Sequence, residues 1–323
     1  MRLFLRAASD WRVLLALVPL IIAMVVVDLA SSWLPPPPGT GDTRVMSRPY
    51  PGDMPESPGG DAAVLWAVGD VGDCGSSGDE ETAKLPGASP GTVAILGDVA
   101  YESGTEQQFA DCYGASWGGL RDRTRPVPGN HDYRTAGAAP YFAYFGDLAG
   151  DPTRGYYSYD LGSWHIVALN SNCDAVGGCG EGSPQLDWLA DDLARSNARC
   201  TLAYWHHPLV SSGVHGNDPR MRTAFDQLDR VGADVVLAGH DHDYERFAPQ
   251  DSSGSATANG VRQFVVGTGG KSLRGFTRVR ANSEVRLSRD FGVLRLTLEA
   301  SGYRWDFITV GGEVIDSGSS TCR

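Results

Sequence analysis

The stretch Ala233–Ala238 (ADVVLA), followed directly by Gly239–His242 (GHDH), decides how the rest of this sequence is interpreted. Its first part is short, β-branched and bounded by glycine, which predicts a buried strand that opens into a loop. His240 and His242 then lie two residues apart. If the segment is extended, both imidazoles point to the same side and can converge on one metal site. The alternative is that both histidines lie in a loop and face solvent. The other motifs of the sequence distinguish between these two interpretations.

Composition limits the classes of protein that need to be considered. The chain has 323 residues, of which 41% are hydrophobic and 20% charged, as in a globular protein of one large or two ordinary domains. Its formal net charge of −12 argues against nucleic acid as a specific partner. An anionic substrate would therefore need local cations, and bound metal ions can supply them.

The N-terminal sequence has the pattern of an export signal. Three arginines fall within the first twelve residues, and an apolar run follows over 13–27. We expect residues 1–34 to be either a cleaved signal peptide or a single-span membrane anchor. Both alternatives place the rest of the chain outside the cytoplasm, either anchored to the membrane or secreted or periplasmic. Residues 35–60 are rich in Pro and Gly and lack an apolar period, which predicts a linker.

The cysteines agree with an oxidising compartment. There are six, and none is spaced as a CxxC zinc pair. Cys173 and Cys179 bracket a tight Gly-rich loop and are expected to form a disulfide with each other. Sequence alone leaves the connectivity of the other four open. As a working arrangement we take Cys200 with Cys322 and Cys74 with Cys112.

Apolar patterning predicts an α/β (α+β) fold. Ser183 and Pro184 have the residue types of an N-cap and a first helical position, and the helical spacing of 185–196 follows them. A second amphipathic helix is expected over 219–231. Strands are expected at 62–68, 92–96, 125–127, 155–159, 164–169, 201–205, 233–238, 262–266, 292–299 and 305–310. Two sheets packed face to face with helices outside would satisfy this order.

Polar residues follow five of these predicted strands. The five groups, in chain order, are Asp70, Asp98 with Tyr101, Asn130 with His131, His206 with His207, and His240 with His242. Carboxylate and amide oxygens together with imidazoles are the ligands that a site for two cations requires. Any one member could be a turn or loop residue, but the ordered set predicts a dinuclear metal centre.

The same set of motifs, GDxG, GDxxY, GNHD, WHHP and GHxH, resembles that of the calcineurin-like metallophosphoesterase superfamily. Tyr101 in GDxxY narrows the resemblance to the purple acid phosphatase branch. It implies a four-layer α-β-β-α sandwich with two packed mixed β-sheets, formed here by a catalytic domain over 61–323. Plant members of the branch carry an N-terminal β-sandwich domain, whereas this chain has only the spacer, so the compact single-domain form is implied.

The resemblance also implies the ligands of two metal ions. The first, Fe(III) in the family, would be bound by Asp70, Asp98, Tyr101 and His242. The second, a divalent ion (Fe, Zn or Mn), would be bound by Asp98 as a bridge, Asn130, His206 and His240. Hard anionic donors suit a trivalent ion, and imidazoles with an amide suit a divalent one. The usual HxP spacing of the family favours His206 over His207 as the ligand.

In the mechanism that the resemblance implies, a metal-bridging hydroxide attacks the phosphorus in line. His131 would protonate the leaving alkoxide as general acid, and Asp132 would orient it. His215 matches the place of a further catalytic, substrate-facing histidine. The residues expected to contact substrate are Asn130, His207, His215 and Arg246. For Arg246 a structural salt bridge is the alternative, and His165 is expected to be structural.

The function implied is that of an exported, metal-dependent phosphomonoesterase, acid phosphatase-like, acting on a small phosphoester. Phosphodiester or nucleotide hydrolysis on the same centre is the alternative. A more distant possibility is a non-catalytic extracellular binding protein, which loss of a ligand position would indicate, but all seven implied ligands are present. No protein partner is predicted.

Overall fold

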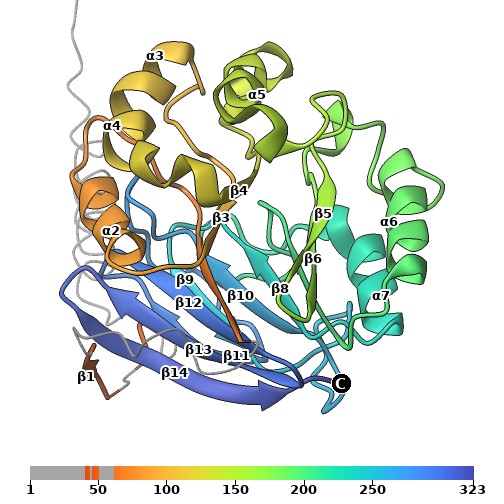
Figure 1. Cartoon of the computed structure of the whole chain (residues 1–323). Helices are drawn as coiled ribbons and strands as arrows, with labels where there is room; N and C mark the ends of the chain where they lie inside the picture. Colours follow the sequence, from red (N-terminus) through yellow and green to blue (C-terminus); the bar gives the residue numbers. More distant parts are fainter. Residues whose placement is uncertain (1–40, 44–45, 51–61) are drawn as a thin grey trace, which may run out of the picture. The chain divides into compact units, whose positions relative to one another are not determined.

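Two seven-stranded β-sheets pack against each other, with helices on their outer faces (Figure 1). This computed structural model describes residues 41–43, 46–50 and 62–323. Thr40–Arg323 groups as one unit, to which the description applies. The predicted export segment 1–34 and most of the predicted linker lie outside the described residues. In the described part, no helix combines the length and the apolar character needed to cross a membrane.

Both sheets are mixed, as predicted. The first has the order β1 (Arg48–Pro49), β14 (Glu313–Thr321), β13 (Gly302–Thr309), β12 (Gly292–Glu299), β2 (Ala63–Val68), β3 (Thr92–Leu96) and β4 (Thr124–Val127). The second has the order β11 (Ser283–Leu287), β9 (Tyr244–Phe247), β10 (Arg262–Val266), β8 (Val235–Ala238), β7 (Cys200–Tyr204), β6 (Trp164–Ala168) and β5 (Tyr157–Leu161). Strands β2, β3 and β4 are parallel, as are β6, β7, β8 and β10, so their carboxyl ends lie at common edges.

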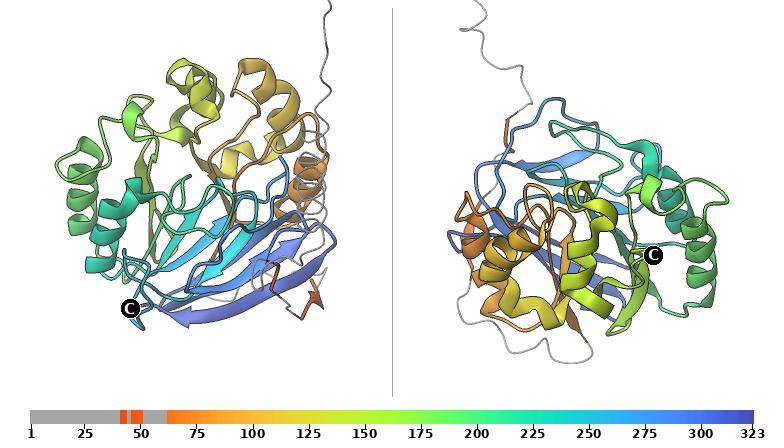
Figure 2. Two further views of the ribbon diagram at one scale, coloured as in Figure 1. Left: turned by 180° about the vertical axis from the view of Figure 1, so that it is seen from behind. Right: turned by 90° about the horizontal axis from the view of Figure 1, so that it is seen from above.

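The helices divide between the two sheets. One group follows strands of the first sheet: α2 (Gly78–Gly87), α3 (Glu106–Gln108), a π-helical turn (Phe109–Tyr113), α4 (Gly114–Ser116) and α5 (Ala139–Phe145), of which α5 leads from β4 into the second sheet. The second group, α6 (Pro184–Arg195) and α7 (Arg222–Arg230), packs on the second sheet. Figure 2 shows these groups on different sides of the molecule. Short 3₁₀ turns cover Gly118–Arg123, Asp132–Arg134, Ala136–Ala138, Gly146–Ala149, Cys173–Ala175 and Pro219–Met221.

Strand residues alternate between two apolar cores. In β7, Leu202 and Tyr204 enter the core between the sheets, whereas Ala203 packs beneath α6 and α7. In β8, Val235 and Leu237 enter the inter-sheet core, and Val236 enters the helix-covered one. Successive side chains of a strand point to opposite faces, so a strand covered on both faces must be apolar throughout. This explains the continuous apolar runs from which the strands were predicted.

The three disulfides join the cysteines as in the working arrangement. Cys173 bonds Cys179, Cys200 bonds Cys322, and Cys74 bonds Cys112. The bond between Cys200 and Cys322 spans 122 positions and ties the C-terminal strand to the start of β7.

Several elements differ from the prediction. The segment 219–231 begins as a 3₁₀ turn before α7, and Ser183 occupies the N-cap of α6 without a side-chain capping bond. The patterns did not identify α2 to α5, β9, β11 or β14. Helix α2 has glycine at both ends and Pro86 within it, so it lacks a regular helical pattern.

Removing the disulfide between Cys200 and Cys322 is expected to destabilise the fold more than removing the one between Cys173 and Cys179. Loop-closure entropy predicts losses of about 4–5 and about 2 kcal/mol in the free energy of unfolding for these long and short loops. The measurement is urea unfolding of the two double Cys→Ala variants and the wild type. Equal losses would show that loop length does not determine how much each disulfide stabilises the fold.

Candidate metal centre

The ends of five parallel strands bring the predicted polar groups together. Asp70 follows β2, Asp98 follows β3, and Asn130 follows β4; β7 and β8 of the other sheet lead into the two histidine motifs. The sheets are joined here, since the Gly69 amide donates to the Val266 carbonyl at 2.8 Å. The two rows of strand ends therefore face one common region.

Three of the predicted ligands adopt a left-handed backbone: Asp70 (φ 61°), Asp98 (φ 50°) and His240 (φ 73°). Asp and His tolerate this conformation better than most residues, although it carries strain. The φ of His240 also corrects the premise that GHDH is extended. The two imidazoles lie in different parts of the site, because His240 packs against His206, whereas His242 lies against Tyr101.

Two glycines leave the space that the ligand side chains occupy. A Cβ on Gly97 would lie 2.5 Å from Nδ1 of His206, and Gly97 has a φ of +88°. A Cβ on Gly129 would lie 2.1 Å from Oδ1 of Asp98 and 2.2 Å from its backbone nitrogen. Close approach therefore requires glycine both before Asp98 and before Asn130, and the left-handed φ of Gly97 favours glycine there as well.

The first group of donor atoms surrounds the hydroxyl of Tyr101. That hydroxyl donates to Oδ1 of Asp70 at 2.7 Å and lies 3.0 Å from Oδ2 of Asp98. Nε2 of His242 lies 3.3 Å from the same hydroxyl and 3.3 Å from Oδ1 of Asp70. All four side chains are at least nine-tenths buried. The structure thus brings together the four residues predicted for the first metal.

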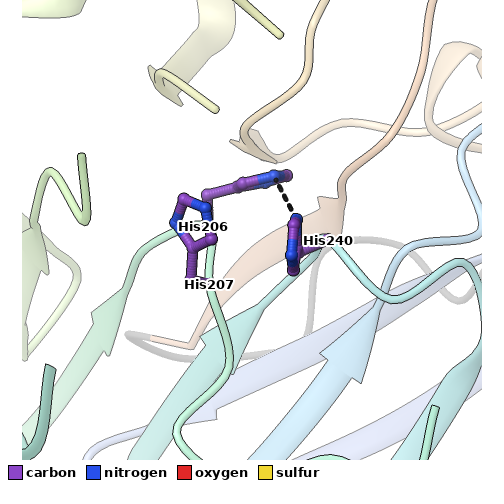
Figure 3. Close-up of side chains that lie close together, drawn as sticks. All are labelled: His206, His207 and His240. Carbon is purple, nitrogen blue, oxygen red and sulfur yellow. Dashed lines mark hydrogen bonds between the residues drawn. The ribbon is translucent and has the colours of Figure 1, made fainter. Parts of the chain in front are cut away.

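The second group surrounds Nε2 of His206. This nitrogen lies 3.1 Å from Oδ1 of Asn130, 3.3 Å from Oδ2 of Asp98 and 3.2 Å from Nδ1 of His240. Figure 3 shows His206 and His240 joined by this contact, with His207 beside them. Oδ2 of Asp98 borders both groups, as a bridging carboxylate would.

The chemistry of these donors fits a pair of cations. Ligand atoms bound at about 2.1 Å in octahedral geometry are about 3 Å apart, which is close to the distances within each group. Nδ1 of His206 faces the Leu96 carbonyl oxygen at 2.8 Å and therefore carries a proton. Its Nε2 then faces two acceptor oxygens and a ring nitrogen, an arrangement that requires positive charge, either a proton or a metal ion.

The pKa shifts of the donor groups also indicate that positive charge is required between them. Burial opposes ionisation of Asp70 and Asp98, but the neighbouring histidines hold the pKa of both carboxyls below the usual value. Burial also opposes a charge on His206, yet Asp98 raises its pKa to about 9. For Tyr101, burial and the two carboxylates raise the pKa well above its usual value. A bound cation would favour the phenolate instead.

His131 lies at the edge of the first group. Its backbone amide donates to Oδ1 of Asp98 at 2.7 Å, and its ring centroid is 4.5 Å from that of Tyr101. Nδ1 faces the backbone carbonyl of Glu102 at 2.8 Å, and Arg134 contacts Nε2 at 3.1 Å. Burial lowers the pKa of His131, and Asp98 opposes this shift.

Asp132 has a different position from the one predicted. Its carboxylate accepts the backbone amides of Gly129, at 2.8 Å, and Val99, at 3.2 Å. Burial, together with Asp98, raises its pKa to about 7. Asp132 therefore shapes the loop that carries the ligands, and the carbonyl of Glu102 is the group that holds the His131 ring.

His207 and His215 lie on the other side, around His240. Nδ1 of His207 is 2.8 Å from the hydroxyl of Ser171, and its ring centroid is 4.5 Å from that of His240. Burial, with the adjacent histidines, lowers the pKa of His207 well below its usual value. The ring of His215 lies 4.3 Å from that of His240, centroid to centroid. The structure thus brings His207 and His215 together around the predicted ligand His240.

The predicted substrate contact of Arg246 is wrong. Arg246 instead forms a structural salt bridge, which was the alternative expectation. Its guanidinium donates to Asp316 at 2.7 Å, pairs with Glu284 and lies over the ring of Trp305. His165 is also engaged away from the site, 2.8 Å from Asp192 and 3.2 Å from Asp160.

The loop between β10 and β11 also contacts the site, although its sequence did not predict this. In it, Ser272 Oγ lies 2.8 Å from Nδ1 of His242, and Lys271 lies over the Tyr101 ring at 5.0 Å. Arg274 lies 3.1 Å from Nε2 of His215. The segment TGGKSLRGFTR has no periodic pattern, so only the density of glycine and cations in it could have drawn attention.

Comparisons with known proteins agree with this geometry. Residues 58–244, more than half of the chain, match the family described as calcineurin-like phosphoesterase. Purple acid phosphatase 15 of Arabidopsis thaliana is 29% identical over 64% of this chain and 46% of its own length. A nucleotide pyrophosphatase/phosphodiesterase of Hordeum vulgare is 23% identical over 78% of this chain and 81% of its own length. The solved purple acid phosphatase PPD1 of yellow lupin superposes with a TM-score of 0.72 at 21% identity, over 84% of this chain and 55% of that one.

The chain belongs to the calcineurin-like phosphoesterase family. Its predicted resemblance to the purple acid phosphatase branch is confirmed by the relatives and by the shared fold of two packed mixed sheets. The chain spans about half the length of the first of these relatives.

Substituting Gly129→Ala is expected to disrupt metal binding, because the added methyl group would overlap the Asp98 carboxylate. Metal content measured on the purified protein should fall from about two ions per chain to one or none. Gly119→Ala is the matched control, since a Cβ there has no atom within 4 Å. Full metal content in Gly129→Ala would contradict the bridging position of Asp98.

Proposed function

We propose that this chain is an exported, metal-dependent phosphomonoesterase of the acid phosphatase type. Residues 61–323 form its catalytic domain, 35–60 a linker, and 1–34 a signal peptide or membrane anchor. Three disulfides support an oxidising, extracytoplasmic location, either anchored or secreted. Its substrate is a small phosphoester.

The observation that carries this proposal is the pair of donor groups that meet at Oδ2 of Asp98. A metal ion in the first group would be held by Asp70, Asp98, Tyr101 and His242. A metal ion in the second would be held by Asp98, Asn130, His206 and His240. The phenol and two carboxyls of the first group suit Fe(III), and the second suits divalent Fe, Zn or Mn. When bound, two such cations lower the pKa of a shared water and stabilise the charge on phosphate oxygens.

The side chains around these donors supply the rest of the chemistry. The Nδ1 proton of His131 is held by the Glu102 carbonyl, which leaves Nε2 as the atom for proton transfer to a leaving alkoxide. Arg134 contacts this nitrogen in the absence of substrate, so a substrate oxygen must displace it. His207 and His215 border the opposite side and are positioned to orient the ester.

Phosphodiester or nucleotide hydrolysis is a second candidate. The observation that favours it is the similarity to the Hordeum vulgare protein, which extends over most of that relative's length. The two functions use the same centre and differ in the room left for a second ester substituent. Paired assays on nitrophenyl phosphate and bis-nitrophenyl phosphate therefore distinguish them.

Asp98→Ala is expected to abolish activity, because it removes the carboxylate common to both donor groups. Hydrolysis of nitrophenyl phosphate should fall at least about 1000-fold, which corresponds to about 4 kcal/mol of transition-state stabilisation. The bis ester should be a poorer substrate for the wild type. A well-folded wild type with no metal and no turnover would instead support the non-catalytic binding protein.

Tyr101→Phe tests whether the first ion is ferric. A tyrosinate bound to Fe(III) gives the wild type a visible charge-transfer band, and removal of the phenol oxygen should abolish it. The measurement is the absorption spectrum of both proteins alongside their metal content. A colourless, fully metallated wild type would show that another ion occupies the first group.

A further inference from the structure

The loop between β10 and β11 is bonded directly to the candidate metal centre. The amide of Lys271 donates to the Asp70 carbonyl at 3.1 Å, and that of Arg274 donates to the His242 carbonyl at 2.9 Å. Upstream, Gly269 donates to the Gly69 carbonyl at 3.0 Å. The backbone positions of Lys271 and Arg274 are therefore set by the residues that follow β2 and β8.

Three cationic side chains contact the predicted site residues: Arg134 at His131, Lys271 at Tyr101 and Arg274 at His215. Two of them are neutralised locally. Arg134 lies 3.7 Å from a carboxylate oxygen of Glu102, and Lys271 pairs with Glu102 and, at 3.0 Å, with Asp73.

Arg274 differs from the other two. Within the described part of the chain, no carboxylate lies within ion-pair distance of its guanidinium. The side-chain partner that it has is Nε2 of His215, at 3.1 Å. A guanidinium can only donate hydrogen bonds, so this nitrogen must be a neutral acceptor.

A neutral imidazole is a weak partner for a guanidinium. Carboxylate and phosphate groups bind it more strongly, because both partners are charged and two hydrogen bonds can form in parallel. Among the residues that the structure describes, Arg274 is therefore a cation without an anionic partner.

The position of His215 indicates which part of a substrate could reach Arg274. The backbone amide of His215 donates to Oδ1 of Asp241 at 2.8 Å, and its ring packs on His240. Arg274 contacts the Nε2 edge of this ring and is thus one imidazole removed from the predicted ligand His240. A group bound by Arg274 is consequently distinct from the phosphoryl group held between the two donor groups.

We propose that Arg274 is a specificity residue that binds a second anionic group on the substrate. The preferred substrates are phosphate esters that carry a further carboxylate or phosphate a few bonds from the scissile one. This inference rests on the proposed phosphoesterase function. The anionic group replaces His215 as the partner of the guanidinium.

The experiment uses a matched series of three-carbon esters: propyl phosphate, 3-phosphooxypropanoate and propane-1,3-diyl bisphosphate. Their hydrolysis is measured with the wild type, Arg274→Gln and Arg274→Lys, with metal content and thermal unfolding recorded for each. Arg278→Gln is the matched control, because Arg278 is an exposed cation in the same loop.

In the wild type, KM for the two esters with a second anion should be about tenfold below that for propyl phosphate, as expected for one charge-assisted contact. Arg274→Gln should bring the KM values of the three esters to within about twofold of one another, and a change in kcat that is common to all three does not enter this comparison. Arg274→Lys should restore part of the KM difference, and Arg278→Gln should behave as the wild type.

Other outcomes would overturn the inference. Equal KM values for the three esters in the wild type would show that no second anion is recognised. A loss of kcat on all three in Arg274→Gln with the KM difference between the esters retained would assign Arg274 to the reacting phosphoryl group or to His215. Hydrolysis of propyl phosphate by the wild type shows in either case that the proposed function holds, whereas an inactive, metallated wild type would overturn both.

Discussion

Two carboxylates buried side by side, Asp70 and Asp98, are the constraint on which the site depends. They lie at the ends of neighbouring parallel strands, are at most 1% exposed, and share the hydroxyl of Tyr101 as a donor. Burying such charges is unfavourable unless positive charge lies nearby. His206 supplies part of it by protonation, because Asp98 raises its pKa to about 9, and metal ions would supply more of it. The folded chain therefore favours cations at this position before any substrate is considered.

The backbone is strained at several of the residues that form the site. Asp70, Asp98 and His240 adopt left-handed conformations, and Gly97 and Gly129 leave room that no side chain could share. Strained residues of this kind persist only where the surroundings fix them. Here the strands on either side are buried on both faces, so the packing of two apolar cores holds the loops in place. The stability of the sheets thus maintains a geometry that the loops would not adopt alone.

The parts of the structure that could be predicted are those with a local signal. Apolar runs identified the inner strands, and residues at the ends of parallel strands necessarily meet at one edge. The position of Arg246 depends on Asp316, 70 residues away, and no local pattern records that pairing. The contact of His131 with Glu102 uses a backbone carbonyl, which every residue possesses. The error over His240 arose because an extended backbone was assumed where a left-handed one occurs.

The net charge of the whole molecule and the charges around the candidate metal centre have opposite consequences for an anionic substrate. A net charge of −12 repels a phosphate ester at long range, but salt screens that repulsion beyond about 10 Å. Around the candidate metal centre the local charges favour an anion instead. The innermost carboxylates are matched by histidines and by the metal ions they would bind, and Arg134 and Lys271 are paired with Glu102 and Asp73 around them. Among the cations that contact the site, Arg274 has no carboxylate within ion-pair distance in the described residues, so an anion placed beside it would meet the least compensated positive charge of the three.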